Sequence, residues 1–276
     1  AIGILPVVDS ERDLGARLSY SRKRSKTTLD VKLAECLRIC ERIQYLPLGL
    51  EVRAALVRCF VINKALYACG ATPPSHRALS KLRAACTRAI WGQANPWRAP
   101  EMVYTLLCRG HTADPRQAFA YTTFLVARRV MRRRPELQAT FANTLQRRRE
   151  LHNPATIGGP VSALMRAAHI ANIDIEQWDC IEHLYEHNTG EVKALAWLSP
   201  ASDTSHFCHV VRESLRLEEW TTVSCRRASF EGMLYGVDRP ATMELHRMLG
   251  GLPECLTLHG IVPFGFTVSD LPTPAL

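Results

Sequence analysis

The first third of the chain carries three blocks of helical hydrophobic periodicity, separated by short segments rich in proline and glycine. In the first block, over residues 27–43, apolar residues recur every three or four positions and share one face. The second block, from about Leu50 to Cys69, is apolar on more than one face, which is typical of a helix central to a bundle. The third block runs from His76 to Trp91. These blocks predict a three-helix bundle over residues 27–93.

The stretch before the bundle has a different pattern. Residues 4–20 contain a short apolar run and then an alternation of apolar and polar positions, which predicts an extended strand or hairpin. Gly15 within it indicates a bulge or a close approach of another backbone. The basic sequence SRKRSK follows at residues 21–26 without any periodicity, so we expect a loop there. Residues 1–26 therefore form a strand and a basic loop.

Further helical patterns follow the bundle. They cover residues 101–108, 114–134 and 135–149, and arginine accumulates in the last turns of the second and third. The turn-rich sequence NPATIGG, at 153–159, is the expected domain boundary. Beyond it, short strands or coil are expected in EVKALAWL and TTVSC, and helices at 160–171, 174–187, 203–220, 239–249 and 253–260. The chain is thus predicted to be mainly α, with an Arg-rich helical region at 94–152 and an acidic helical C-terminal region at 153–276.

Charge is distributed unevenly over the 276 residues. The whole chain has a net charge of +9, but residues 1–150 hold 27 basic against 11 acidic side chains, whereas residues 151–276 hold 8 against 15. Arginine supplies 29 of the 35 basic residues. Because arginine binds phosphate bidentately and stacks on bases, this basic half favours a nucleic-acid partner, RNA or DNA. A GC-rich coding sequence, which raises arginine content without any function, is the alternative explanation.

Three basic clusters are the candidate nucleic-acid contacts. One is the SRKRSK loop, and the other two lie at the ends of the successive helices that close the basic half. The helix dipole favours a cation in the last turn, but adjacent arginines repel one another, so these clusters exceed what capping needs. We expect them to follow a phosphate backbone, although a nuclear localisation signal is a rival interpretation of the loop. The candidate residues are Arg22, Lys23, Arg24, Lys26, Arg128, Arg129, Arg132, Arg133, Arg134, Arg147, Arg148 and Arg149.

Motifs of several enzyme classes are absent from the sequence. It contains no glycine loop that cradles phosphates, no nucleophile elbow and no HExxH zinc pair. The best metal candidates are Cys180, His183 and His187, because a helix would place all three on one face. A core cysteine and two histidines on a polar face explain the same spacing. We therefore expect no cofactor and no catalytic residue in this chain.

Cysteine usage and the absence of a long apolar run bear on the compartment. Ten cysteines are spread without a C-x-x-C pair, mostly within apolar helical patterns, as is typical of reduced, buried thiols in an intracellular protein. No apolar run approaches the roughly 18 residues of a membrane helix, so no membrane partner is expected. The chain begins at Ala1 without a secretory signal. We expect a fragment of an intracellular protein, nuclear or cytoplasmic.

The order of these features resembles the region after the catalytic palm in reverse transcriptases of non-LTR (LINE-type) retrotransposons. In that family a strand containing Leu-Gly, the primer grip, precedes a helical thumb with spaced motif residues. The similarity covers about residues 10–150 well and the remainder weakly. The matching residues are Asp13-Leu14-Gly15, Leu46-Pro47, Arg53, Lys64-Ala65-Leu66-Tyr67, Pro73, Leu79, Leu82-Arg83 and Ala89-Ile90-Trp91-Gly92.

The resemblance implies a thumb and post-thumb fragment of an RNA-directed DNA polymerase. Leu14 and Gly15 would present backbone to the primer end, and the basic clusters would hold an RNA–DNA hybrid or its strands. The catalytic palm is missing here, so Mg²⁺ would bind only in that palm, and the upstream palm and fingers of the same polyprotein would be a partner. This chain alone would be inactive. Two other interpretations are a non-enzymatic helical RNA- or DNA-binding host protein and a helical protein-interaction module with a basic docking face.

Overall fold

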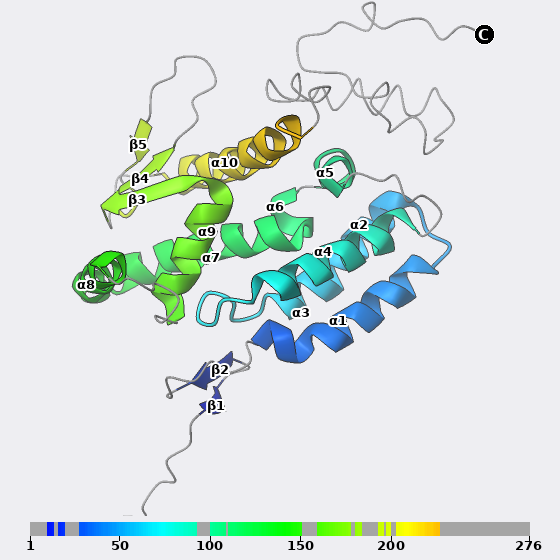
Figure 1. The fold of residues 1–276 in the computed structure, drawn as a ribbon, viewed down its shortest axis with the longest axis horizontal. Coiled ribbons are helices and arrows are strands. Elements are labelled where there is room, and N and C mark those ends of the chain that lie inside the picture. Colours follow the sequence, from blue (N-terminus) through cyan, green and yellow to red (C-terminus); the bar gives the residue numbers. More distant parts are fainter. Residues whose placement is uncertain are drawn as a thin grey trace, which may run out of the picture.

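The computed structural model is mainly helical, as the sequence predicts (Figure 1). It describes residues 10–13, 16–19, 28–92, 100–108, 110–150, 159–177, 180–183, 193–195, 197–199 and 203–226. Among the helices in these ranges, none combines the length and the apolar character that crossing a bilayer requires.

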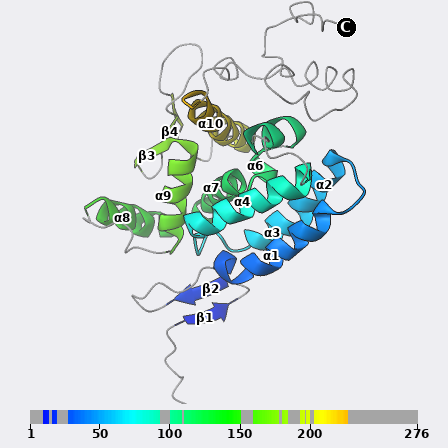
Figure 2. The same cartoon turned by 45° about the vertical axis from the view of Figure 1, so that its right-hand side comes forward.

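The predicted three-helix bundle is present. α1 and α4 lie along each other in both views of the ribbon (Figures 1 and 2), and a second helical segment packs against both. That segment runs without a break through α2, a π-helical turn and α3, and it ends at Ala65, before the predicted Cys69. The elements are α1 (Thr28–Gln44), α2 (Leu50–Leu56), η1 (Val57–Ile62), α3 (Asn63–Ala65) and α4 (His76–Trp91).

Local signals fix both ends of α4. The hydroxyl of Ser75 accepts a hydrogen bond from the backbone N–H of Ala78 at 3.2 Å, which caps the first turn. Gly92 follows the last residue with φ +95°, a conformation in which a side chain would be strained. Between these ends Leu82 and Ile90 are fully buried against the other bundle helices. The sequence therefore specifies both the length of α4 and the face that it buries.

The helices after the bundle surround α7, which packs against α4, α9 and α10 and so joins the bundle to the C-terminal helices. α7 begins at Pro115, a residue suited to the first helical position, after the Asp114 side chain accepts a hydrogen bond from the N–H of Arg116 at 2.8 Å. Buried apolar residues form one continuous cluster from the bundle to α10. The elements are α5 (Pro100–Met102), η2 (Val103–Leu107), α6 (Gly110–Ala113), α7 (Pro115–Arg133), α8 (Leu137–Glu150), α9 (Gly159–Ala171) and α10 (Thr204–Ser224).

Two small antiparallel sheets accompany the helices. The N-terminal hairpin pairs β1 (Ser10–Asp13) with β2 (Ala16–Ser19), in agreement with the extended structure predicted there. The second sheet has the order β3-β4-β5, formed by β3 (Ile173–Gln177), β4 (Cys180–His183) and β5 (Lys193–Leu195). The last of these strands falls within the predicted extended segment EVKALAWL.

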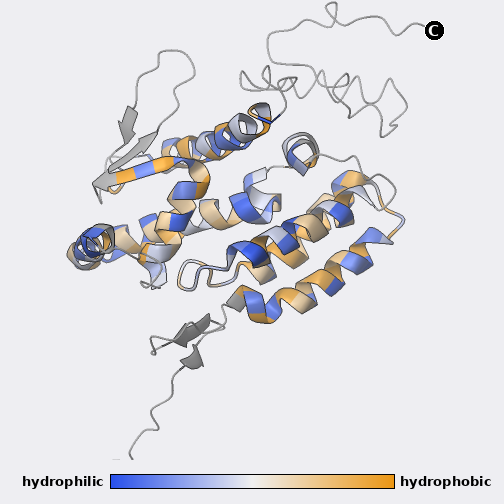
Figure 3. Cartoon of the chain, in the orientation of Figure 1, coloured by the Kyte–Doolittle hydropathy of each residue, from blue (hydrophilic) through white to orange (hydrophobic). Residues whose placement is uncertain are grey.

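The structure corrects two predicted elements. Residues 174–187 were expected to be helical, but β3 and β4 occupy the described part of this range. Ile173 and Ile175 are buried and Asp174 is exposed, a period of two that Figure 3 shows as alternating colours along β3. The TTVSC segment, expected as strand or coil, forms the last turn of α10 up to Ser224. The helices predicted at 239–249 and 253–260 lie outside the described residues, as does the predicted boundary at 153–159 except for Gly159, the first residue of α9.

Candidate nucleic-acid interface and a buried ion cluster

Four arginines lie exposed over the last turns of α7 and the residue that follows it. Arg132 and Arg133 belong to the final turn, and the N–H of Arg134 still bonds to the carbonyl oxygen of Val130. Arg134 also meets Glu136 at 3.2 Å, but this ion pair is well exposed, so water screens it strongly. We call Arg129, Arg132, Arg133 and Arg134 the α7 arginine cluster.

The third predicted cluster lies near the C-terminal end of the next helix, α8. Arg147 is exposed there, and Arg148 and Arg149 follow it within the same helix. The two clusters that closed the basic half of the sequence therefore lie on successive helices, joined through residues 134–136 (Figure 1). Each of the two helices thus carries its arginines towards its C-terminal end.

Arg128 is a correction to the predicted set of phosphate contacts. Its side chain is buried, at 5% exposed, and its Nε donates to the carbonyl oxygen of Trp197 at 2.8 Å. Its Nη1 donates to the hydroxyl of Thr204 at 2.8 Å, and the guanidinium lies 5.0 Å from the centre of the Phe207 ring. Burial lowers the pKa of Arg128, and the nearby charge of Arg132 adds to this effect. Arg128 thus fastens the start of α10 to α7 and is not available to a phosphate.

The N-terminal candidates lie outside the described residues. These are the two primer-grip residues and the basic loop: Leu14, Gly15, Arg22, Lys23, Arg24 and Lys26. The strands on either side of Leu14 and Gly15 are described, and Asp13 pairs with Ala16.

The predicted metal candidates do not share a helical face. Cys180 and His183 lie at the two ends of β4, and His187 is outside the described residues. Their spacing of three and four suits a helix, but the described part of the segment is a strand, so that expectation is wrong. Within the described residues, no group of three histidine, cysteine or acidic side chains could hold a metal ion.

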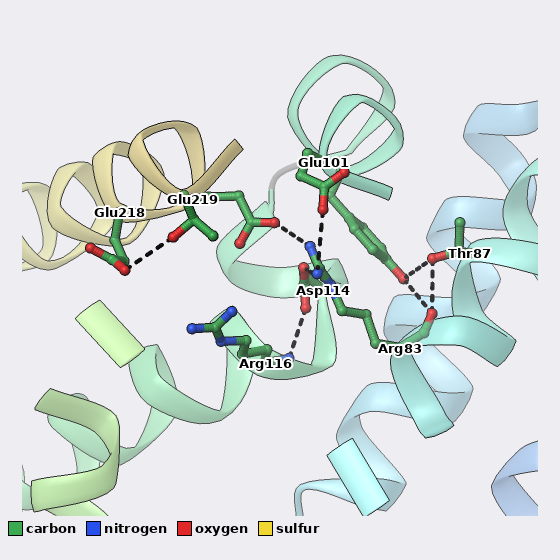
Figure 4. Close-up of polar contacts among 9 residues, drawn as sticks. Arg83, Thr87, Glu101, Asp114, Arg116, Glu218 and Glu219 are labelled. Atoms are coloured by element: carbon green, nitrogen blue, oxygen red, sulfur yellow. Dashed lines mark hydrogen bonds and ion pairs between the residues drawn. The ribbon is translucent and has the colours of Figure 1, made fainter. Parts of the chain in front are cut away.

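A buried ion cluster, which the sequence did not reveal, joins four elements around Arg83 of α4 (Figure 4). Its Nε donates to Asp114 at 2.7 Å, its Nη2 pairs with Glu219 of α10, and its Nη1 lies 3.7 Å from Glu101 of α5. The Asp114 side chain is fully buried and Glu219 is nearly so. Because Arg83 and Glu219 are 136 residues apart in sequence, no local pattern could bring them together.

The cluster has three carboxylates around one guanidinium, and the pKa values reflect this imbalance. Burial raises the pKa of Asp114 to about 6, although the charge of Arg83 opposes the rise. Burial alone would lower the pKa of Arg83, but the carboxylates of Asp114, Glu219 and Glu101 outweigh it and raise that pKa. The fully buried phenol of Tyr104 donates to the backbone carbonyl oxygen of Arg83 at 3.2 Å. The arrangement fixes α10 and α7 against α4.

Comparison of this chain with known proteins identified no similar protein. No family model, no curated protein and no solved structure matches this chain.

Proposed function

We propose that this chain binds nucleic acid through the α7 arginine cluster and the arginines of α8, as the helical thumb and post-thumb part of a non-LTR reverse transcriptase. The observation that carries the proposal is the gathering of four exposed arginines within two turns at one helix end. Arginine forks match phosphate oxygens, and several on one surface follow a backbone without reading its sequence. The excess of basic residues in the first half of the chain agrees with a holding role.

The test is binding of the whole chain to an RNA–DNA hybrid, duplex DNA and single strands over a series of salt concentrations. Each phosphate contact makes the slope of log affinity against log salt concentration more negative by about 0.7–0.9. We expect a slope of roughly −4 or steeper and the tightest binding to the hybrid. No binding at low salt by a folded, monomeric sample would exclude the proposal.

A matched pair of variants locates the surface. R132Q/R133Q removes two charges from the α7 arginine cluster, and R38Q/R42Q removes two exposed charges from α1. The first variant should flatten the salt slope by about 2, because two phosphate contacts are lost, and the second should change it by much less. Equal losses in the two variants would assign the affinity to net charge and not to the cluster.

Docking to another protein is the second candidate function, favoured by large apolar side chains exposed on the bundle. Val31 of α1, Val52 of α2, Phe60 of η1 and Tyr67, just beyond α3, are each at least half exposed. In the reverse transcriptase interpretation, the partner is the upstream palm of the same polyprotein. Salt-sensitive self-association of a sample without nucleic-acid affinity would favour docking over the first proposal.

A further inference from the structure

A cavity of about 380 Å³ lies between the mid-section of α10 and the segment from η2 to the first turn of α7. Its lining includes Gly110, His111, Gln117, His209, Arg212 and Arg216. None of these residues belongs to the α7 arginine cluster. The cavity therefore offers a second, separate set of basic groups.

The lining is rich in hydrogen-bond donors. Arg212 and Arg216 lie one turn apart on α10, and His111 and His209 approach from different helices. Among the described residues that line the cavity, the one carboxylate is Glu213, which accepts from Nε of Arg216 at 2.8 Å. This pair leaves the cavity with a surplus of positive charge from Arg212.

Hydrogen bonds from Nε orient the guanidinium groups of Arg212 and Arg216. Nε of Arg212 donates to the carbonyl oxygen of Cys208 at 2.9 Å, which orients the side chain and leaves its terminal nitrogens for another acceptor. Nη1 of Arg216 is buried and has no hydrogen-bond partner among the described residues. That atom is covered by the protein, so a ligand in the cavity would meet the other atoms of this partly exposed side chain. A phosphate oxygen is the strongest acceptor that a guanidinium meets.

Gln117 adds an amide to the same wall because residue 110 is a glycine. A Cβ atom at Gly110 would lie 2.6 Å from Oε1 of Gln117, so a larger residue would displace that amide. The Gln117 side chain is otherwise buried. The position of the amide is thus a consequence of the glycine.

From this geometry we propose that the cavity binds a phosphate monoester attached to a group of about nucleoside size. The two arginines hold the phosphate, and the remaining volume, at the lower end of that of small-molecule sites, is far larger than a phosphate needs. A free mononucleotide and the 5′-phosphorylated end of a strand share this chemistry. Because the cavity and the α7 arginine cluster use different residues, this proposal stands or falls independently of the proposed function.

The experiment measures binding to the whole chain by isothermal titration calorimetry. The ligands are AMP, GMP, adenosine and one short oligonucleotide in two forms, with and without a 5′-phosphate. We expect AMP or GMP to bind at least about tenfold more tightly than adenosine, as loss of a charge-assisted contact predicts. Tighter binding of the phosphorylated oligonucleotide than of the nucleotides identifies a strand end as the source. The reverse order identifies a free nucleotide. Either order supports the proposal.

Variants decide whether the cavity is responsible. R212Q/R216Q should weaken AMP binding by about tenfold or more, and G110A should weaken it while leaving the charge unchanged. R226Q removes an exposed charge just beyond the end of α10 and should have no effect. The proposal is overturned if the folded chain binds no nucleotide. It is also overturned if AMP and adenosine bind equally, or if both G110A and a folded R212Q/R216Q variant keep the original affinity.

Discussion

Asp114 acts both as the cap of α7 and as a buried carboxylate beside Arg83. Burial raises the pKa of Asp114 to about 6 in the folded chain. Between about pH 4 and pH 6, Asp114 is therefore protonated in the folded state and ionised in the unfolded state. The contribution of Asp114 to the free energy of unfolding therefore falls as the pH rises through this window. D114N keeps a side-chain acceptor for the cap and removes the ionisation.

We expect the stability difference between D114N and the original chain to grow in favour of the variant from pH 4 to pH 6. Urea unfolding at several pH values measures it. D203N is the control: hydrogen bonds from the backbone N–H groups of Ser205 and His206 lower the pKa of Asp203. The contribution of its charge is thus fully present above the ordinary aspartate pKa and is lost only below it, as the pH falls to the lowered pKa of the folded chain. The D203N difference should therefore stay nearly constant from pH 4 to pH 6. A D114N difference independent of pH would contradict the assignment.

Removal of Arg83 should be far more harmful than removal of an exposed arginine on the same helix. R83M leaves the buried Asp114 and Glu219 carboxylates without their cation, a loss that typically costs about 3–5 kcal/mol. R88M, at an exposed position of α4, should change the free energy of unfolding by no more than about 0.5 kcal/mol. Adding D114N and E219Q to R83M should restore part of the stability in urea unfolding. A mild effect of R83M would show that the carboxylates are neutral in the folded chain.

At the scale of the element, two adjacent arginines of α7 have opposite roles. Arg128 is buried and holds the first turn of α10, whereas Arg129 is exposed. R128M should speed amide hydrogen exchange in the first turn of α10 and lower stability, yet leave nucleic-acid affinity of the folded chain unchanged. R129Q should leave stability within about 0.5 kcal/mol and flatten the salt slope by about 1. Hydrogen exchange and salt titration of both variants measure these effects. If R129Q lowered stability and R128M flattened the salt slope, the roles assigned to Arg128 and Arg129 would be wrong.

The helices that the sequence predicted well are those with explicit end signals. Ser75 and Gly92 bound α4, and Asp114 with Pro115 starts α7. The segment after Ile173 was wrongly predicted as a helix because its isoleucines fit a helix about as well as a strand. Only the burial of alternate residues in the structure distinguishes the strand from a helix. The opposite error occurred at the end of α10. There β-branched residues suggested a strand, but Trp220 and Val223 are buried on one helical face.

The candidate sites also differ in how far the sequence alone predicts them. Adjacent arginines are visible directly in the sequence, so all four residues of the α7 arginine cluster were among the predicted candidates, but the buried Arg128 was wrongly included with them. That residue is one turn from Arg132 in sequence, and only the packing of Trp197 and Phe207 against α7 shows that it is buried. The ion cluster and the cavity join segments distant in sequence, and no local periodicity encodes such contacts.

For the molecule as a whole, thiol chemistry reports the integrity of the core. Burial raises the pKa of Cys36 and Cys69 to about 11, so these thiols are protonated as well as covered. Iodoacetamide at pH 8, followed by mass spectrometry, should modify Cys59 and Cys225 in the native chain. It should reach the buried thiols only in urea: Cys36, Cys40, Cys69, Cys86 and Cys108. Rapid native modification of Cys86 would contradict the continuous core.

The long separation between Arg83 and Glu219 also affects how the protein is made. A ribosome adds about 5–20 residues per second, so α4 precedes the Glu219 codon by roughly 7–27 seconds. During that interval the nascent chain can pair Arg83 with Glu101 and Asp114 only. The last partner, Glu219, is synthesised with α10, after the whole of the basic half. Completion of the ion cluster is therefore a late event of translation, and a stalled nascent chain should expose the surface of α7 and α9 that α10 later covers.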